Sequence, residues 1–123
     1  MIVYIDGACA TVAKDQRQGS WGMYWRNNSL RNKSGLCEYP PHMNSRAEAE
    51  ALLHALIAHR CSDYYKWPLI IASDSAYVCD TINTYRATWE WYNIPGTTEM
   101  AIINKGNEVL HSDLWGKIIT EID

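Results

Sequence analysis

Hydrophobic and polar positions in the first third of the chain follow the pattern of short β-strands. A run of β-branched and aromatic residues occupies Ile2 to Ile5 and stops at Asp6-Gly7, which predicts a strand ending at a turn. Apolar residues alternate again from Trp21 to Trp25, and a third strand-like run, Leu36 to Tyr39, is followed by two prolines. We expect these three runs to form an antiparallel meander.

The middle of the chain changes to a helical composition. From Ser45 to about His59 it is rich in Ala and Leu, the best helix formers, and Ser45 is well placed as the N-cap. The continuous apolar run Leu69 to Ser73 then predicts a buried strand that ends at Asp74. If the helix is a crossover between neighbouring strands, this strand lies parallel to Ile2–Ile5.

The last third of the chain is less regular. Apolar residues recur at helical spacing from Tyr77 to Tyr85 and again from about Ser112 to Ile122, whereas the Trp-rich piece Thr88 to Tyr92 has no clear period. The order of these elements predicts a single α/β domain over residues 1–123. Its mixed sheet is antiparallel on one side and parallel where the helix crosses over, and helices flank it.

The amino-acid composition excludes several classes of protein. A chain of 123 residues with 47% hydrophobic and 20% charged residues is typical of one globular domain, and a net charge of −3 argues against nucleic-acid binding through bulk positive charge. No apolar run approaches the ~20 residues of a membrane span, and the N-terminus lacks the pattern of a signal peptide. The four cysteines have no zinc-ligand spacing and fit reduced thiols. We therefore expect an intracellular protein that is neither secreted nor attached to a membrane.

Three carboxylates could meet at one edge of the predicted sheet. Asp6 and Asp74 each end a strand, and the two strands would lie side by side. On a helical wheel Glu48 shares the apolar side of its helix and faces the sheet, whereas Glu50 falls on nearly the opposite side with His54. Converging carboxylates repel one another unless cations neutralise them, and Mg²⁺ or Mn²⁺ is the expected kind of cation. Two such ions ~3.5–4 Å apart promote displacement at phosphorus, so phosphodiester hydrolysis is the leading chemistry.

Each carboxylate also has an ordinary structural interpretation. Glu48 stands three residues after Ser45, which is the spacing of a capping box. Asp6 and Asp74 could be simple turn or cap residues, because Asp is common at both kinds of position. The residues alone leave both interpretations open.

Five segments of the chain together resemble type 1 ribonuclease H, in order and at suitable spacings. They are Val3–Cys9 (VYIDGAC), Trp21–Trp25 (WGMYW), Asn44–Glu48 (NSRAE), Ala72–Val78 (ASDSAYV), and Asn104-Lys105 onward to Ser112–Trp115 (SDLW). The resemblance implies the fold of that family, a five-stranded sheet flanked by helices. It also implies the activity of the family, endonucleolytic cleavage of the RNA strand of an RNA–DNA hybrid.

The resemblance also assigns roles to individual residues. It implies that Asp6, Glu48 and Asp74 are catalytic carboxylates that bind two Mg²⁺ or Mn²⁺ ions. It places Asn44 and Ser45 where the family contacts the hybrid backbone from the start of the helix. The turn from Cys9 to Ala10 falls where the family meets the minor groove, in which the RNA 2′-hydroxyls are displayed.

Two features depart from the family pattern. Many relatives carry a basic protrusion after the second helix, but Thr88–Asn93 offers Trp89 and Trp91 and no Lys or Arg; we expect the two Trp side chains to pack rather than to stack on bases. The family also continues beyond the point where this chain ends, with a fifth strand, a loop bearing a His and a helix carrying a fourth carboxylate.

These departures leave two functions open. The first is a ribonuclease that is incomplete or needs a partner, and the alternative is a non-catalytic nucleic-acid-binding or interaction module that retains the fold. Without a fifth strand, Leu69–Ser73 would be an open apolar sheet edge, which is a template for association. We therefore predict either a homodimer or a partner segment that restores the strand and the fourth carboxylate. For the isolated chain we expect the homodimer, in which two copies of this strand pair antiparallel.

Overall fold

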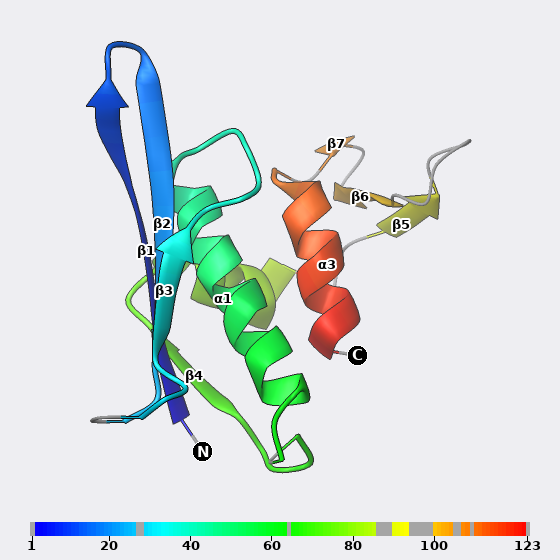
Figure 1. Cartoon of the computed structure of the whole chain (residues 1–123). Helices are drawn as coiled ribbons and strands as arrows, with labels where there is room; N and C mark the ends of the chain where they lie inside the picture. The colour runs from blue at the N-terminus through cyan, green and yellow to red at the C-terminus, as the bar shows by residue number, and fades with distance from the viewer. Residues whose placement is uncertain are drawn as a thin grey trace.

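The structure, a computed structural model, describes residues 2–26, 29–63, 65–85, 90–93, 100–104, 107–108 and 110–122, with side chains outside 84–109. Its main sheet has four strands in the order β3-β2-β1-β4 (Figure 1). The strands are β1 (Ile2–Ala13), β2 (Gln16–Tyr24), β3 (Lys33–Leu36) and β4 (Ile70–Ser73). The first three strands form an antiparallel meander and β4 runs parallel to β1, which confirms the predicted mixed sheet.

The predicted bounds of all three N-terminal strands are wrong, and the second strand begins at Gln16 rather than at Trp21. The first strand does not stop at Asp6-Gly7, because β2 pairs with β1 along its whole length, from Tyr4 opposite Tyr24 to Ala13 opposite Gln16. The third strand lies earlier than predicted: Leu36 is its last residue rather than its first. These errors have one cause, since the backbone partners that extend a strand lie elsewhere in the sequence and leave no mark on the strand's own pattern.

Three helices accompany the sheet. They are α1 (Asn44–Arg60), α2 (Ala76–Asp80), which continues into the π-helical turn η1 (Thr81–Tyr85), and α3 (Ser112–Ile122). Helix α1 lies between the main sheet and α3 (Figure 1). These bounds confirm the predicted helices, and none of the described helices is long and apolar enough to cross a membrane.

A second, three-stranded antiparallel sheet was not predicted. It consists of β5 (Glu90–Asn93), β6 (Met100–Asn104) and β7 (Asn107–Glu108). Strands of two to five residues are too short to establish a period, so sequence patterns miss them. Trp89 and the side chain of Trp91 lie outside the described part of the chain, and their predicted packing stays a prediction.

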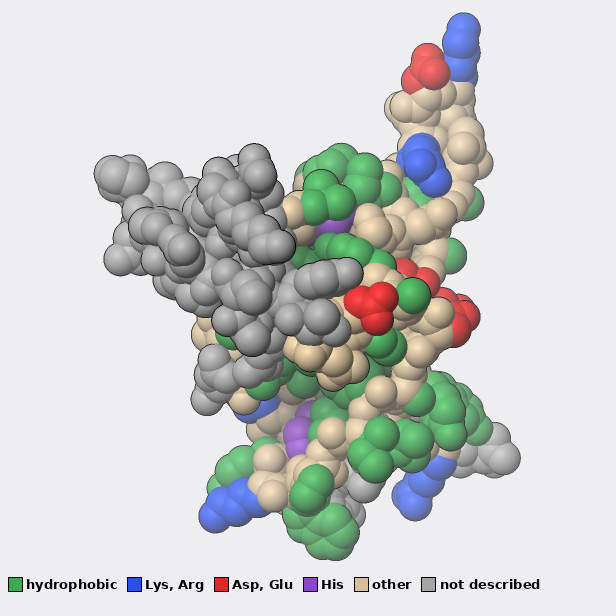
Figure 2. Space-filling model, turned by 180° about the vertical axis from the view of Figure 1, so that it is seen from behind, with side chains coloured by type: hydrophobic (Ala, Val, Ile, Leu, Met, Phe, Trp, Pro, Cys, Tyr) green, Lys and Arg blue, Asp and Glu red, His purple; other side chains and the backbone are tan. Residues whose placement is uncertain are grey.

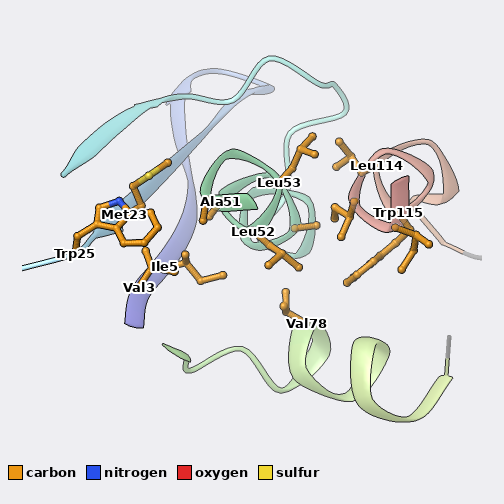
Figure 3. Packing of buried hydrophobic residues seen from close by; sticks show 14 residues of the cluster. Val3, Ile5, Met23, Trp25, Ala51, Leu52, Leu53, Val78, Leu114 and Trp115 are labelled. Carbon is orange, nitrogen blue, oxygen red and sulfur yellow. The ribbon is translucent and has the colours of Figure 1, made fainter. Parts of the chain in front are cut away.

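The hydrophobic core packs against two sides of α1. Val3 and Met23 of the sheet pack toward one side of this helix, and Leu114 and Trp115 of α3 pack toward another, with Leu52 between them (Figure 3). A helix buried on both sides is apolar over most of its circumference. This explains why the apolar residues of Ser45–His59 are not confined to the side of the helix that Glu48 shares.

We predict that Gly7 is the glycine on which the packing of α1 against the sheet depends. A Cβ atom at Gly7 would lie only 2.3 Å from the carbonyl carbon of Ala47 and 2.4 Å from the amide nitrogen of Glu48. Because this obstruction is backbone, Gly7→Ala must separate β1 from α1 and should lower the free energy of unfolding by about 1–3 kcal/mol. Thermal and urea unfolding measure this loss.

Gly116→Ala is the matched control for that substitution. A Cβ atom at Gly116 would meet none of the described atoms within 4 Å, and the position lies inside α3. Ala is the better helix former, so this variant should gain up to about 1 kcal/mol. Equal stability of the Gly7→Ala protein and the unsubstituted protein would contradict the close approach of β1 and α1.

Candidate active site

Parallel pairing between β1 and β4 brings Asp6 and Asp74 together. The pairing ends with Ile5 opposite Ser73, so the two aspartates are the next residues of adjacent strands. Glu48 reaches the same point from the second turn of α1, which the missing side chain of Gly7 allows to lie directly against β1. One carboxylate oxygen from each of the three residues lies within 4.8 Å of the others. The structure therefore brings together all three predicted metal-binding carboxylates.

Glu48 is the least solvated of the three. Its burial, followed by the nearby charges of Asp6 and Asp74, raises its pKa to about 7, although the backbone N–H of Gly7 opposes this shift. Its Oε2 atom is buried and has no hydrogen-bond partner in the described structure. A buried carboxylate oxygen without a donor is costly, and a cation would satisfy it.

The geometry and chemistry of the three carboxylates fit a divalent cation. All of their ligand atoms are hard oxygens, as Mg²⁺ and Mn²⁺ prefer. Oxygens at ~2.1 Å from one ion are at most about 4.2 Å apart. The observed spread of up to 4.8 Å therefore lets the three side chains close on one ion or share two.

The ordinary interpretations of these carboxylates are not supported. The N-cap of α1 is Met43, which makes no side-chain capping bond, so Ser45 lies inside the helix and there is no capping box with Glu48. Asp6 is part of a continuous strand, where its Oδ1 accepts a hydrogen bond of 2.9 Å from the Gly7 N–H. The N-cap of α2 is Ser75 and not Asp74.

The three predicted substrate-binding residues lie beside this cluster at the contact between β1 and α1. The backbone N–H of Cys9 donates a hydrogen bond of 2.8 Å to Asn44 Oδ1, so these two residues are joined directly. Ser45 Oγ lies 2.9 Å from His111 Nε2. Cys9 and Ala10 belong to β1 rather than to the predicted turn. Contact of these residues with a hybrid stays a prediction.

Sequence reasoning missed an ionic network behind Ser45, in which Arg46 is buried and Asp113 is exposed. Arg46 is 4% exposed, and its guanidinium donates two hydrogen bonds of 2.9 and 2.8 Å to the carboxylate of Asp113 and a third to the Tyr39 carbonyl. Arg46 thereby lowers the pKa of Asp113. This network ties the first turn of α1 to the first turn of α3. A basic and an acidic residue at the starts of two predicted helices were the only signals of it.

The helical wheel also misplaced Glu50. This residue is 1% exposed rather than solvent-facing, and its Oε1 accepts a hydrogen bond of 2.7 Å from the Glu38 N–H. Burial, with Glu50 next in importance, raises the pKa of the nearby Cys37 thiol to about 12. All four cysteines are free. Glu50 therefore holds the segment after β3 against α1 and does not belong to the carboxylate cluster.

The topology and the three carboxylates define the class of protein as an RNase H-like α/β fold with an acidic site at the edge where β1 and β4 meet. A sequence model of the RNase H family matches residues 1–119. The chain therefore belongs to the RNase H family, a family of ribonucleases that cleave RNA–DNA hybrids.

Two solved structures are similar over almost the whole chain. One is the foamy viral protease-reverse transcriptase in complex with dsDNA, with a TM-score of 0.65 at 18% identity over 98% of this chain and 72% of that chain. The other is LC9-RNase H1, a type 1 RNase H with the type 2 active-site motif, with a TM-score of 0.59 at 16% identity over 99% of this chain. The protein spans 57% of the latter chain. No curated protein matches the sequence.

We predict that Glu48 makes the stability of the metal-free protein fall as pH rises. Its pKa is raised from 4.5 to about 7 in the folded state, so Glu48 has no effect on the free energy of unfolding while it is protonated in both states, below pH 4.5. As the pH rises from 4.5 through 7, the unfolded state loses this proton more readily than the folded state, and the free energy of unfolding falls. Glu48→Gln removes this titration. The variant should match the unsubstituted protein near pH 4 and exceed it in thermal stability at pH 8 in EDTA.

Added Mg²⁺ provides the second arm of this experiment. It should raise the melting temperature of the unsubstituted protein at pH 8 but leave that of Glu48→Gln nearly unchanged, because an amide is a poor ligand for this ion. Asp63→Asn, which removes an exposed carboxylate after α1, is the control. Identical pH profiles for Glu48→Gln and the unsubstituted protein would contradict the electrostatic description of the cluster.

Proposed function

We propose that this protein hydrolyses the RNA strand of RNA–DNA hybrids, using two divalent cations, Mg²⁺ or Mn²⁺, held by Asp6, Glu48 and Asp74. The observation that carries the proposal is the convergence of three carboxylates around a buried Glu48 oxygen that no donor among the described residues satisfies. Membership of the RNase H family supports the substrate class.

The proposed mechanism divides the work among the three carboxylates. When bound, the ions supply an attacking hydroxide and stabilise the leaving oxygen. Asp6 and Asp74 are exposed and can hold a cation where a phosphodiester could approach. Glu48 is partly buried and has to be ionised to act as a ligand, so cation binding releases its proton at neutral pH. Gly7 donates to Asp6 and keeps that carboxylate aimed at the cluster.

In this proposal, recognition of the hybrid depends on Cys9, Asn44 and Ser45. All three lie at the contact of β1 with the start of α1, beside the carboxylates. The net charge is −3, and Lys and Arg side chains lie scattered toward the ends of the face in Figure 2. Short-range hydrogen bonds to the backbone and the minor groove, rather than a basic surface, would therefore select the hybrid.

Replacement of a single aspartate tests the metal-dependent mechanism. Asp74→Asn and Asp6→Asn should each abolish hydrolysis of a labelled hybrid and weaken Mn²⁺ binding in calorimetric titration. Both should leave the circular dichroism spectrum unchanged and stabilise the metal-free protein slightly, because one of three like charges is gone. Asp80→Asn, which removes an exposed carboxylate at the end of α2, should keep both properties.

The outcome separates the two functions that the sequence leaves open. Full Mn²⁺ affinity in the Asp74→Asn protein would overturn the metal site. An unsubstituted protein that binds the hybrid but hydrolyses it with neither Mg²⁺ nor Mn²⁺ would instead support the non-catalytic module.

We propose in addition that the isolated chain forms a homodimer through the edge at Leu69–Ser73. In the described structure β4 pairs only with β1, and Ile70 is 62% exposed. A groove of about 580 Å³ adjoins this edge and includes Leu69, Ile71 and Ile82 in its lining. An exposed apolar strand edge of this kind pairs readily with another copy.

Sedimentation at tens of micromolar tests this pairing. Ile70→Lys should shift the protein to the monomer, because a charge on an edge strand opposes pairing, whereas Leu36→Lys on the opposite edge strand β3 should leave the dimer intact. A monomeric unsubstituted protein whose Ile70 and Ile71 amides are already protected from exchange would overturn the proposal.

A further inference from the structure

We propose that His111 is a positioning residue that fixes the hydroxyl of Ser45 as a hydrogen-bond donor toward a phosphate oxygen of the hybrid. This inference rests on the proposed function for its ligand. The orientation of the hydroxyl follows from the described contacts of His111 alone.

The first step concerns the proton on the imidazole ring. Arg46 Nη1 lies 3.1 Å from His111 Nδ1, and a guanidinium nitrogen can only donate. His111 Nδ1 must therefore accept, so a neutral ring carries its proton on Nε2. A proton on Nδ1, in either the other tautomer or the charged ring, would point at the N–H of Arg46.

The surroundings of the ring keep it in this state. Burial and the positive charge of Arg46 lower the pKa of His111, with Asp113 opposing them. The rings of His111 and Tyr77 make an edge-to-face contact, with their centroids 6.2 Å apart and an interplanar angle of 89°. Arg46 is itself held by both oxygens of Asp113. Groups from α1, α2 and α3 thus hold one orientation of the ring.

The second step concerns the hydroxyl. The Nε2–H of His111 donates to Ser45 Oγ across 2.9 Å, which occupies a lone pair of the oxygen and leaves the hydroxyl proton free. The described part of the chain makes no other hydrogen bond to this side chain. The opposite tautomer would take that proton and leave only lone pairs facing the ligand. Because phosphate oxygens only accept, the state of His111 decides whether Ser45 attracts or repels a phosphate.

The backbone at His111 suits this arrangement and also guides the choice of variant. His111 has a φ of 59°, in the left-handed region that Asn tolerates better than most residues. His111→Asn therefore removes the ring with little backbone strain. Ser45→Ala removes the hydroxyl, and Ser45→Thr restores it.

A direct measurement of the tautomer comes first. Long-range ¹H–¹⁵N correlation spectra of the full chain should show His111 protonated at Nε2 and unprotonated at Nδ1 near pH 7. The opposite pattern, or a doubly protonated ring, would overturn the inference without reference to any nucleic acid.

The second experiment measures the affinity of the protein for a hybrid, with Ca²⁺ in place of Mg²⁺ so that the hybrid is not cleaved. Ser45→Ala and His111→Asn should each weaken binding about tenfold, the loss expected for one hydrogen bond to a charged group. Ser45→Thr should retain affinity. The double variant should be no weaker than either single one, since both remove the same interaction. Ser34→Ala on the exposed surface of β3 is the control.

The possible failures are distinct. If the unsubstituted protein binds hybrid and His111→Asn binds equally well, or if the two losses add, His111 only supports the fold and the inference is wrong. If the unsubstituted protein binds no hybrid, the proposed function fails and this inference fails with it.

Discussion

The direct backbone contact between β1 and α1 is the constraint on which the rest of this structure depends. At Gly7 the strand lies so close to Ala47 and Glu48 that no Cβ atom fits between them. This approach sets the first turns of α1 against the strand residues that follow Ile5, so Glu48 meets Asp6 and Asn44 meets the N–H of Cys9. A displacement of the helix would separate both pairs at once. The position of the carboxylates is thus a property of main-chain packing rather than of side-chain adjustment.

Two groups of charged side chains meet the start of α1, one of opposite charges that attract and one of like charges that repel. Arg46 and Asp113 satisfy each other through two hydrogen bonds and hold α1 to α3. The cluster of Asp6, Glu48 and Asp74 contains only acidic side chains, and the burial of Glu48, followed by the charges of Asp6 and Asp74, raises the pKa of Glu48. The buried Arg46 has a carboxylate partner and so avoids the cost of an unpaired buried charge, whereas the carboxylates of the cluster repel one another. The two groups meet α1 at Arg46 and Glu48, which lie within one turn of the same helix.

The sequence alone predicted the elements that a long run of neighbouring residues encodes. Ala and Leu over Ser45–His59 predicted α1, and an apolar run ending at Asp74 predicted β4 and the site at its end, although β4 is partly exposed rather than buried. Features that depend on partners distant in sequence were missed or misplaced. The extension of β1 past Asp6 depends on β2, the burial of Glu50 depends on the Glu38 amide, and the bond of Ser45 depends on His111. A helical wheel assumes one buried side, and α1 has two.

The proposed substrate-binding surface has to work with little help from long-range charge. A chain with a net charge of −3 gains little from counterion release, so neutral donors and acceptors would supply most of its discrimination. A neutral group discriminates only when its direction is fixed, because a freely rotating hydroxyl or amide satisfies many ligands equally. The Cys9 N–H fixes Asn44 and the ring of His111 fixes Ser45, each through a single bond to another element. Preorganisation at these two positions is therefore the physical alternative to a basic surface in a protein that has few cations to offer.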